Sequence, residues 1–444
     1  MDSSTIQRAG RLACRVGRAL LLSALLASNA CEHDAGPRQM AAHAPPASSS
    51  AEQIVLAPHA GDHSLDERIR ELQRRIPTSK IPAQELERLG WTFIARAREL
   101  ADPGSYNLAL QCALAIEQRD ASSHAALLLR GHALHSLHHF AEAERIARKL
   151  VEARGLPFDH GLLGDVLVDR GQLDEASTAY QRMVDLRPDM HSYSRAAHVR
   201  YLTGDLPGAL EAMAMASRAA SPRNREGFAW TWAKLAQYQL QSGAPELAQS
   251  SAERALEVAP DSPQALKVSA QIRLARSELE PALDALRKAI ERSPHPELLW
   301  MSVEALRGLD RTEQAHELEV TLLASGESED PRAFALYLAT IGRDLPLAER
   351  LVQAEWAERK DCYGYEALAW VQSARGRHAE ALRNAERSIA TRSEDPRLYY
   401  HAGLIAERAG DPDRARDWLA HAASGASLLL PSQRAQLTAR QFAL

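Results

Sequence analysis

The chain has 444 residues, of which 45% are hydrophobic and only 5% aromatic, and it carries 53 basic and 58 acidic side chains, for a net charge of −5. This mildly acidic balance argues against nucleic acid as a partner, because phosphate binding draws on clustered Lys and Arg. The sequence shows no alternating strand pattern, and its richness in Ala and Leu is typical of helices packed on helices.

The N-terminus, residues 1–30, has the features of a secretory signal. Arginines at Arg8, Arg11, Arg15 and Arg18 precede a short apolar run from Ala19 to Ala30. This run is too short to cross a bilayer as a helix, and the basic residues ahead of it are typical of a signal peptide. We therefore expect the protein to be exported.

Cys31 follows Ser28, Asn29 and Ala30, and this junction resembles the lipobox of bacterial lipoproteins, in which the cysteine receives lipid after cleavage. The resemblance implies a lipid anchor rather than a spanning helix, at the cell envelope and facing the periplasm; Glu32 in the next position favours the outer membrane. Ser28 stands where that family usually has Leu, and Ser28 with Ala30 also fits ordinary signal cleavage. Simple secretion as a soluble periplasmic protein and an uncleaved anchor therefore remain open.

Residues 31–60 are rich in Ala, Pro, Ser and His without a sustained period, which predicts a flexible tether. Ser64 and Glu67 then form a capping-box pattern ahead of apolar residues at helical spacing. We expect an N-terminal capping helix within residues 61–87. At the other end, residues 431–444 predict a polar-faced C-terminal capping helix.

Between these ends an alanine recurs with an average spacing of 34 residues, at Ala143, Ala176, Ala209, Ala248, Ala282, Ala315, Ala348, Ala381 and Ala415. A glycine a few residues ahead of most of these alanines marks the end of a first helix, because glycine accepts the left-handed backbone conformation. These glycines are Gly171, Gly204, Gly243, Gly342, Gly376 and Gly410. Ser277 and Asp310 hold the same place in two further units.

Each unit is thus a pair of helices, and its pattern resembles the tetratricopeptide repeat. Leu163-Gly164 matches the Leu-Gly pair of that family, and Ala255 to Pro263 matches its closing segment. The resemblance covers about ten units from residue 88 to 430 and implies an all-α, right-handed superhelical solenoid with capping helices. It further implies a non-enzymatic scaffold that holds a partner protein or peptide in its concave groove.

The groove positions of the repeat, transferred to this sequence, select a first group of residues: His132, His135, Asp165 and His198. Histidines three residues apart share a helical face, where imidazoles can bind a metal or make a partner site sensitive to pH. No closed ligand set is visible, so we interpret these histidines as lining an ordinary groove and predict no metal or cofactor. A metal- or ligand-binding envelope protein remains an alternative.

A second group lies in the later units: Trp300, Glu304, Arg307, Trp370, Tyr400, Glu407 and Arg408. Aromatic residues and arginine are typical anchors of protein interfaces, so a partner helix or peptide is expected toward the C-terminal half of the groove. The alternative is that Trp300 and Tyr400 fill gaps between units.

Motifs for catalysis are absent from the sequence, including phosphate-binding loops, zinc-protease helices and nucleophile elbows. We therefore predict no catalytic residues, and a regulatory subunit of an envelope enzyme remains a second alternative. Cys112 and Cys362 fall in the first and ninth units. Because repeat units contact mainly their neighbours, we expect these cysteines to be separate, buried thiols.

Overall fold

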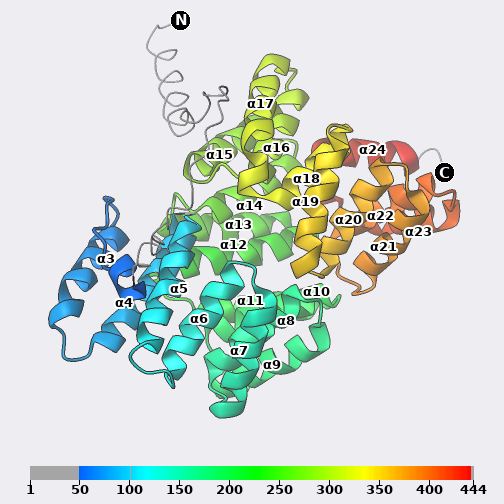
Figure 1. The fold of residues 1–444 in the computed structure, drawn as a ribbon. Coiled ribbons are helices and arrows are strands. Elements are labelled where there is room, and N and C mark those ends of the chain that lie inside the picture. Colours follow the sequence, from blue (N-terminus) through cyan, green and yellow to red (C-terminus); the bar gives the residue numbers. More distant parts are fainter. Residues whose placement is uncertain (1–49, 101, 442–444) are drawn as a thin grey trace, which may run out of the picture. The chain divides into compact units, whose positions relative to one another are not determined.

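The computed structural model describes residues 50–100 and 102–441 (Figure 1). The predicted signal, Cys31 and most of the predicted tether fall on residues 1–49 and therefore lie outside the described residues. None of the helices in the described part of the chain is long and apolar enough to cross a membrane.

Of the helices described, α4 to α23 form ten consecutive hairpins, and each hairpin packs on the next. The expected all-α superhelical array is confirmed, and its first helix begins at Pro82, ahead of the predicted start at residue 88. The hairpins are α4 (Pro82–Glu99) with α5 (Gly104–Glu117), α6 (His124–Ser136) with α7 (Phe140–Ala153), α8 (Pro157–Asp169) with α9 (Leu173–Leu186), α10 (Met190–Leu202) with α11 (Leu206–Ala219), α12 (Arg225–Gln241) with α13 (Pro245–Val258), α14 (Pro263–Ala275) with α15 (Leu279–Arg292), α16 (Pro296–Gly308) with α17 (Thr312–Glu329), α18 (Pro331–Ile341) with α19 (Leu345–Glu358), α20 (Cys362–Ala374) with α21 (His378–Ile389), and α22 (Pro396–Arg408) with α23 (Pro412–Ser424).

The turns and the helix contacts within the hairpins are those that the repeated residues predict. The six turn glycines have φ between 67° and 85°, and Ser277 and Asp310 adopt the same left-handed conformation at 62° and 57°. The nine recurrent alanines are each at most 2% exposed. A small side chain at this position lets the second helix approach the first. The spacing of the alanines therefore equals the length of one hairpin repeat.

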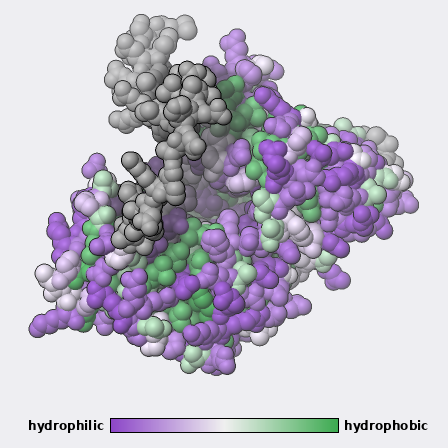
Figure 2. Space-filling model, viewed as in Figure 1, coloured by the Kyte–Doolittle hydropathy of each residue, from purple (hydrophilic) through white to green (hydrophobic). Residues whose placement is uncertain are grey.

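Apolar side chains are largely buried between the helices, and the face in Figure 2 is mostly hydrophilic, with apolar areas near its middle. The large apolar side chains that remain exposed are scattered along the described chain: Ile54, Ile81, Leu156, Leu186, Leu247, Val320 and Ile341. Scattered residues of this kind are usual on folded proteins and do not by themselves mark a binding patch.

Ahead of the hairpins lie α2 (Ala51–Val55), α3 (Ser64–Arg75) and the 3-10 turn η1 (Ile76–Thr78). Helix α2 packs on α5, and the Val55 side chain is fully buried. Residues 50–60, the last part of the predicted tether, therefore include a helix that packs on the array, because Ala51 and Val55 bury apolar surface there.

The N-terminal cap of α3 is formed by His63, where the sequence pattern predicted Ser64. His63 Nδ1 accepts a hydrogen bond from Leu65 N at 3.3 Å, and the Asp66 carboxylate accepts one from His63 N at 3.1 Å. The predicted Ser64 and Glu67 box is therefore displaced by one residue, because the carboxylate that reaches back to the helix start belongs to Asp66.

Asp66 also joins the N-terminal helices to the repeats. It is 2% exposed, accepts a hydrogen bond from Arg96 Nε of α4 at 2.6 Å, and lies 2.7 Å from His59 Nε2. Burial alone would raise the pKa of Asp66, but the hydrogen bonds from Arg96, His59 and His63 lower it to about 2. The buried Asp66 carboxylate therefore holds the N-terminal helices on the first hairpin, in addition to apolar packing.

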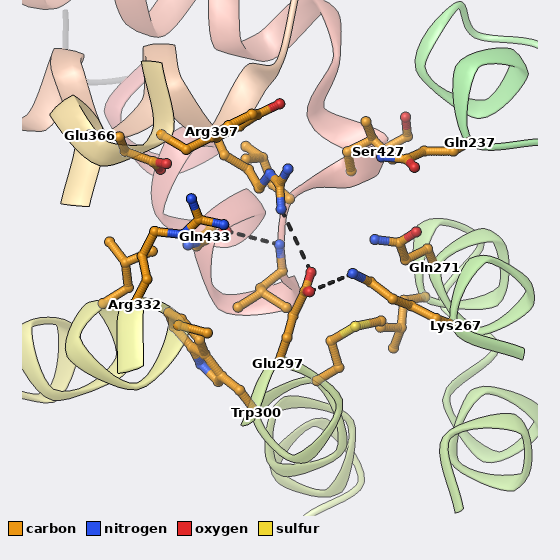
Figure 3. Close-up of a pocket in the computed structure, with 18 of the residues that line it drawn as sticks. Gln237, Lys267, Gln271, Glu297, Trp300, Arg332, Glu366, Arg397, Ser427 and Gln433 are labelled. Atoms are coloured by element: carbon orange, nitrogen blue, oxygen red, sulfur yellow. Dashed lines mark hydrogen bonds and ion pairs between the residues drawn. The ribbon is translucent and has the colours of Figure 1, made fainter. Parts of the chain in front are cut away.

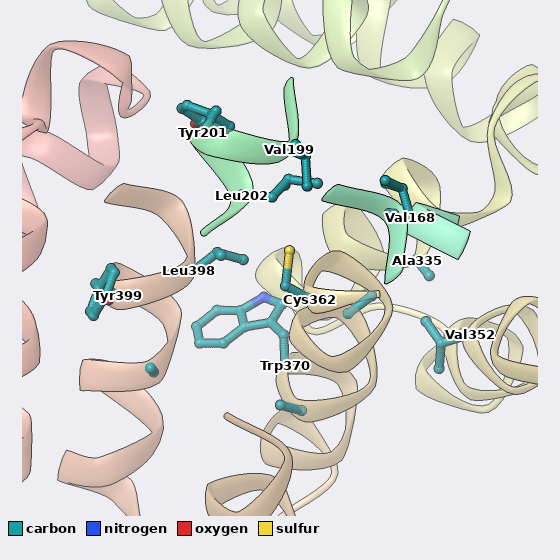
Figure 4. Packing of buried hydrophobic residues seen from close by; sticks show 14 of the residues in the cluster. Val168, Val199, Tyr201, Leu202, Ala335, Val352, Cys362, Trp370, Leu398 and Tyr399 are labelled. Atoms are coloured by element: carbon teal, nitrogen blue, oxygen red, sulfur yellow. The ribbon is translucent and has the colours of Figure 1, made fainter. Parts of the chain in front are cut away.

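The array coils so that hairpins far apart in the sequence meet. Lys360 N, between α19 and α20, donates to the carbonyl oxygen of Asp169 at 3.1 Å, and Arg359 Nη2 lies 2.9 Å from Asp169 Oδ1. Figure 4 shows Cys362 of α20 and Leu202 of α10 in one apolar cluster. The expectation that units contact mainly their neighbours therefore fails at this place.

The two cysteines of the described residues, Cys112 and Cys362, are free and buried, as predicted. Cys112 is fully buried within α5, whereas Cys362 is 5% exposed and takes part in the contact between hairpins far apart in the sequence. Burial raises the pKa of both thiols. Both side chains therefore act as small apolar residues in the core.

After the last hairpin the chain turns back onto the array through the turn η2 (Ala426–Leu428) and the helix α24 (Pro431–Gln441). We call residues 426–441 the C-terminal segment. Turn η2 contacts α12, α14 and α22, and α24 contacts α16 and α23. Ser427 Oγ donates to the Leu240 carbonyl oxygen at 3.2 Å. The helix predicted within residues 431–444 thus lies along earlier hairpins as well as on the last one.

Candidate binding site on the inner face of the array

Asp165, a predicted groove residue on α8, binds other side chains of the protein. Arg195 of α10 donates from Nε and Nη2 to the two carboxylate oxygens at 2.8 and 2.7 Å, and the Tyr180 hydroxyl donates to Oδ1 at 2.8 Å. Burial alone would raise the pKa of Asp165, but the Arg195 guanidinium holds it well below its usual range. Both oxygens are therefore used to join the third hairpin to the fourth.

The three predicted histidines lie in different surroundings. His132 is 7% exposed and packs edge-on against Trp91 with ring centroids 5.3 Å apart, and burial lowers its pKa to about 3. His135 Nε2 lies 2.8 Å from Asp169 Oδ2. Burial lowers the pKa of His198 to about 4. The described residues contain no group of three or more His, Cys, Asp or Glu placed to hold a metal ion, so the metal-binding alternative finds no support here.

Three residues of the second predicted group contact the C-terminal segment. Each presents a polar atom from α16 or α22 to a group on α24. The contacts are Glu304 Oε2 with Ser432 N at 3.0 Å, the Tyr400 hydroxyl with Gln436 Oε1, and Glu407 Oε2 with Arg440 Nε at 2.8 Å. The part of the groove where we expected a partner helix is therefore occupied by the chain's own α24.

Trp370 of α20 and Arg408 of α22 belong to one cluster of stacked side chains on the first helices of successive hairpins. The Trp370 indole N–H donates to Thr340 Oγ1 at 3.0 Å, and its ring stacks on His401 with centroids 4.3 Å apart. The Arg408 guanidinium lies 4.7 Å from the centre of the same ring. Trp370 is only 4% exposed, so its surface is already covered by neighbouring hairpins.

Trp300 and Arg307, the remaining members of the group, also contact neighbours. Trp300 is 9% exposed and meets Tyr337 of the next hairpin edge-on at 5.3 Å. Arg307 Nη2 donates to Glu319 Oε1 of α17 at 2.7 Å, within its own hairpin. Trp300 keeps part of its surface on the cavity described next, whereas Arg307 does not line it.

A cavity of about 320 Å³ lies where the C-terminal segment crosses the inner face (Figure 3). It is lined by α10, α12, α14, α16, α18, α20 and α22, the first helices of seven successive hairpins, and by the stretch from Ser427 to Gln433. Side chains one helical turn apart share a face, so each first helix contributes inward residues to a common wall. This volume is at the small end of ligand-binding pockets, which begin at about 300 Å³.

Charged side chains in and beside the cavity form a series of ion pairs in which cations and anions alternate. Glu297 of α16 accepts a hydrogen bond from Lys267 of α14, and Glu297 Oε1 lies 3.6 Å from Arg397 Nη1 of α22 (Figure 3). Arg397 Nη2 in turn donates to Asp395 Oδ2 at 2.6 Å. Burial alone would raise the pKa of Glu297, but Lys267 and Arg397 lower it to about 2. These two cations and two anions balance one another and join hairpins that are far apart in the sequence.

Other polar groups of the cavity lack such compensation. Lys234 Nζ donates to Gln237 Oε1 at 3.1 Å, and no carboxylate of the described residues lies within 4.0 Å of it. Burial lowers the pKa of Lys234 to about 8. The Tyr201 hydroxyl is buried with no hydrogen-bond partner in the described chain. Arg332 Nη1 also makes no hydrogen bond, but it lies 3.6 Å from Glu355 Oε1 and is therefore paired in charge. An unpaired buried group such as the Tyr201 hydroxyl costs about 1–3 kcal/mol.

Sequence reasoning identified only His198 and Trp300 among the residues that line this cavity. Lys234 with Tyr238, and Lys267 with Gln271, are spaced four apart on first helices, which puts each pair on one helical face. That spacing could have predicted that each pair faces the inside of the array. It does not indicate which hairpins face one another across the cavity.

Three stretches of the chain match the family model of the tetratricopeptide repeat, at residues 162–224, 233–295 and 366–427. The chain therefore contains tetratricopeptide repeats, as the sequence pattern predicted, and repeats of this type generally mediate protein–protein interaction. No curated protein matches the sequence at a significant level.

Several solved structures are similar to this chain at low sequence identity. The APC/C hetero-tetramer Cut9-Hcn1 matches at 13% identity and a TM-score of 0.44, over 88% of this chain and 61% of that chain, so this chain spans less than two thirds of that protein's length. The human IFIT1 dimer with PPP-AAAA matches at 12% identity and a TM-score of 0.46, over 84% of this chain and 93% of that chain. Pseudomonas aeruginosa pilF matches at 16% identity and a TM-score of 0.39, over 54% and 99%.

Proposed function

We propose that this array of tetratricopeptide repeats is a non-enzymatic scaffold that holds a partner protein or peptide on the inner face of its superhelix. Repeats stacked in one dimension create an extended surface, which recognises a partner by shape, apolar anchors and hydrogen bonds. The observation that carries the proposal is the docking of the chain's own C-terminal segment on this face.

The C-terminal segment is held in the way that a partner helix would be. Leu429 and Leu437 are buried anchors, 3% and 2% exposed. Glu304 binds the Ser432 backbone N–H, which lies in the first turn of α24 and has no partner within that helix. Apolar anchors with polar contacts around them are the usual means by which a groove binds an amphipathic helix. The inner face therefore offers suitable chemistry for a helical partner.

Site-specific crosslinking in cells that express the full chain tests this proposal. A photoreactive residue at Gln237 or Gln264, which line the cavity, should capture a defined partner. The matched controls are Leu247 and Val320, which are 59% and 53% exposed on second helices. Capture from the control positions alone, or equally from both faces, would contradict binding on the inner face.

We further propose that the chain is exported and anchored at the cell envelope by lipid on Cys31, facing the periplasm. The support is the sequence of residues 1–31. Cys31→Ser should abolish labelling by a fatty-acid analogue and move the protein from the membrane to the soluble fraction. Cys14→Ser, within the predicted signal, is the matched control. Unchanged membrane fractionation of Cys31→Ser would reject the lipid anchor.

A further inference from the structure

We propose that the cavity beside Lys234 is a binding site for a small organic acid of about amino-acid size, whose carboxylate pairs with the Lys234 ammonium group. The cavity borders the surface that α24 covers, with Gln433 of α24 in its wall, and the proposal goes beyond the scaffold function. It rests on the unpaired hydrogen-bond donors of the cavity, on its charge balance and on its enclosure by the C-terminal segment.

Two donors of the cavity, Tyr201 and Lys234, come from α10 and α12, the first helices of successive hairpins. Tyr201 stacks on Tyr238 with ring centroids 4.8 Å apart, and Tyr238 lies one helical turn beyond Lys234 on α12. The Tyr201 hydroxyl is buried without a partner in the described chain, and Lys234 Nζ uses one of its three donors on Gln237. Buried polar groups are normally satisfied, so a ligand that brings oxygen atoms would satisfy the Tyr201 hydroxyl and the remaining donors of Lys234.

The charge balance of the wall indicates the sign of that ligand. Lys267, Glu297, Arg397 and Asp395 compensate one another, as described above. The other two carboxylates of the wall also have partners: Glu366 Oε1 lies 2.7 Å from His401 Nδ1, and Asp330 Oδ2 lies 3.0 Å from His295 Nε2. Lys234 of α12 therefore has no carboxylate partner among the described residues. One carboxylate from a ligand would compensate its charge.

The shape of the cavity indicates the size of the ligand. Leu428, Leu429, Leu430 and Gln433 of the C-terminal segment form one side of it, so a longer peptide could not run through the cavity without displacing that segment. Trp300 provides apolar surface in the same wall, which suits the hydrocarbon part of a small acid. A ligand held here would touch both the array and the C-terminal segment.

Calorimetric titration of the purified full chain tests the site, with phenylacetate and 4-methylpentanoate as probes and their amides as neutral controls. Both acids should bind and the amides should not. Lys234→Met, which keeps the aliphatic stem and leaves no carboxylate unpaired, should weaken the acids at least about tenfold. Tyr201→Phe, which removes only the hydroxyl group, should also weaken them. Lys288→Met, at an exposed position on α15, should bind like the wild-type chain.

A second measurement separates binding in the cavity from binding elsewhere. Hydrogen exchange of the C-terminal segment should slow when phenylacetate binds, because the ligand contacts that segment. The proposal is overturned if acids and amides bind alike, if Lys234→Met binds the acids unchanged, or if neither acid binds at about 10 mM. It is also overturned if only a peptide such as tetra-alanine binds. None of these results would alter the crosslinking from the inner face, which tests the scaffold function with a different ligand.

Discussion

Gly171, in the turn between α8 and α9, lies directly against the backbone of Lys360, whose carbonyl oxygen would be 2.5 Å from a Cβ atom at that position. Gly204, in the next hairpin, faces the carbonyl oxygen of Arg392 in the same way. Both glycines have positive φ, at 74° and 85°. At these two turns glycine therefore serves the local turn and also the contact between hairpins far apart in the sequence.

Gly171→Ala should destabilise the protein more than Gly243→Ala. Both changes place a Cβ on a left-handed residue, with φ of 74° and 79°, at a cost of about 1–2 kcal/mol. Nothing lies within 4 Å of a Cβ at Gly243, whereas the clash with Lys360 should add about 1–3 kcal/mol at Gly171. Denaturant unfolding of the two variants measures the difference. Equal losses would mean that the contact with Lys360 contributes nothing to stability.

Leu437→Asp should release α24 from the inner face. Leu437 is 2% exposed, and losing a buried leucine costs about 2–5 kcal/mol, which a single short helix held by a few polar contacts cannot offset. Hydrogen exchange should accelerate in residues 426–441 and stay slow in the hairpins. Leu247→Asp, at a position that is 59% exposed, is the control. Unchanged protection of α24 in Leu437→Asp would mean that its docking does not depend on this anchor.

His132 should make the protein less stable in acid. Burial lowers its pKa from 6.5 to about 3, so the unfolded chain binds more protons than the folded one between these values. The free energy of unfolding should therefore fall as the pH decreases below about 6.5, and this residue should account for about 2 kcal/mol between pH 7 and pH 5.

His132→Phe removes the titrating group, so the loss of stability between pH 7 and pH 5 should be smaller in that variant. Urea unfolding at the two pH values measures the slope for each protein. His316→Phe changes a histidine whose side chain is 76% exposed and should leave the slope as it is in the wild-type chain. An identical slope in His132→Phe would show that His132 is not buried in its neutral form.

Asp66→Asn should loosen the N-terminal cap. The change removes the charge that Arg96 and His59 contact at 2.6 and 2.7 Å, at a cost of about 1–3 kcal/mol. Because the pKa of Asp66 is lowered from 3.8 to about 2, the wild-type chain should itself lose this contribution as the pH falls through that interval. Limited proteolysis between residues 50 and 81 detects the loosening. Glu67→Gln is the control, and greater sensitivity there than in Asp66→Asn would favour the cap that the sequence pattern predicted.

The hairpins could be predicted because their constraints are local. Ala176 must be small where two adjacent helices touch, and Gly171 must adopt a left-handed conformation where the first helix ends, so both leave a repeating mark in the sequence. Even Ser277 and Asp310, which lack the freedom of glycine, adopt the conformation that their place in the repeat requires. The predicted cap of α3 was wrong by one residue. The sequence pattern does not distinguish whether Asp66 or Glu67 accepts the hydrogen bond from the backbone at the start of the helix.

The sequence by itself determined the helix pairs, their turns and the burial of the recurrent alanines, because each depends on residues close together in the chain. Tertiary structure alone decided that Asp169 meets Lys360, that Glu297 lies between Lys267 and Arg397, and that α24 covers Glu304 and Tyr400. The physical reason is that each hairpin is rotated slightly against the one before it, and these rotations accumulate along the array. Partners many hairpins apart depend on that sum, which the spacing of alanines does not contain.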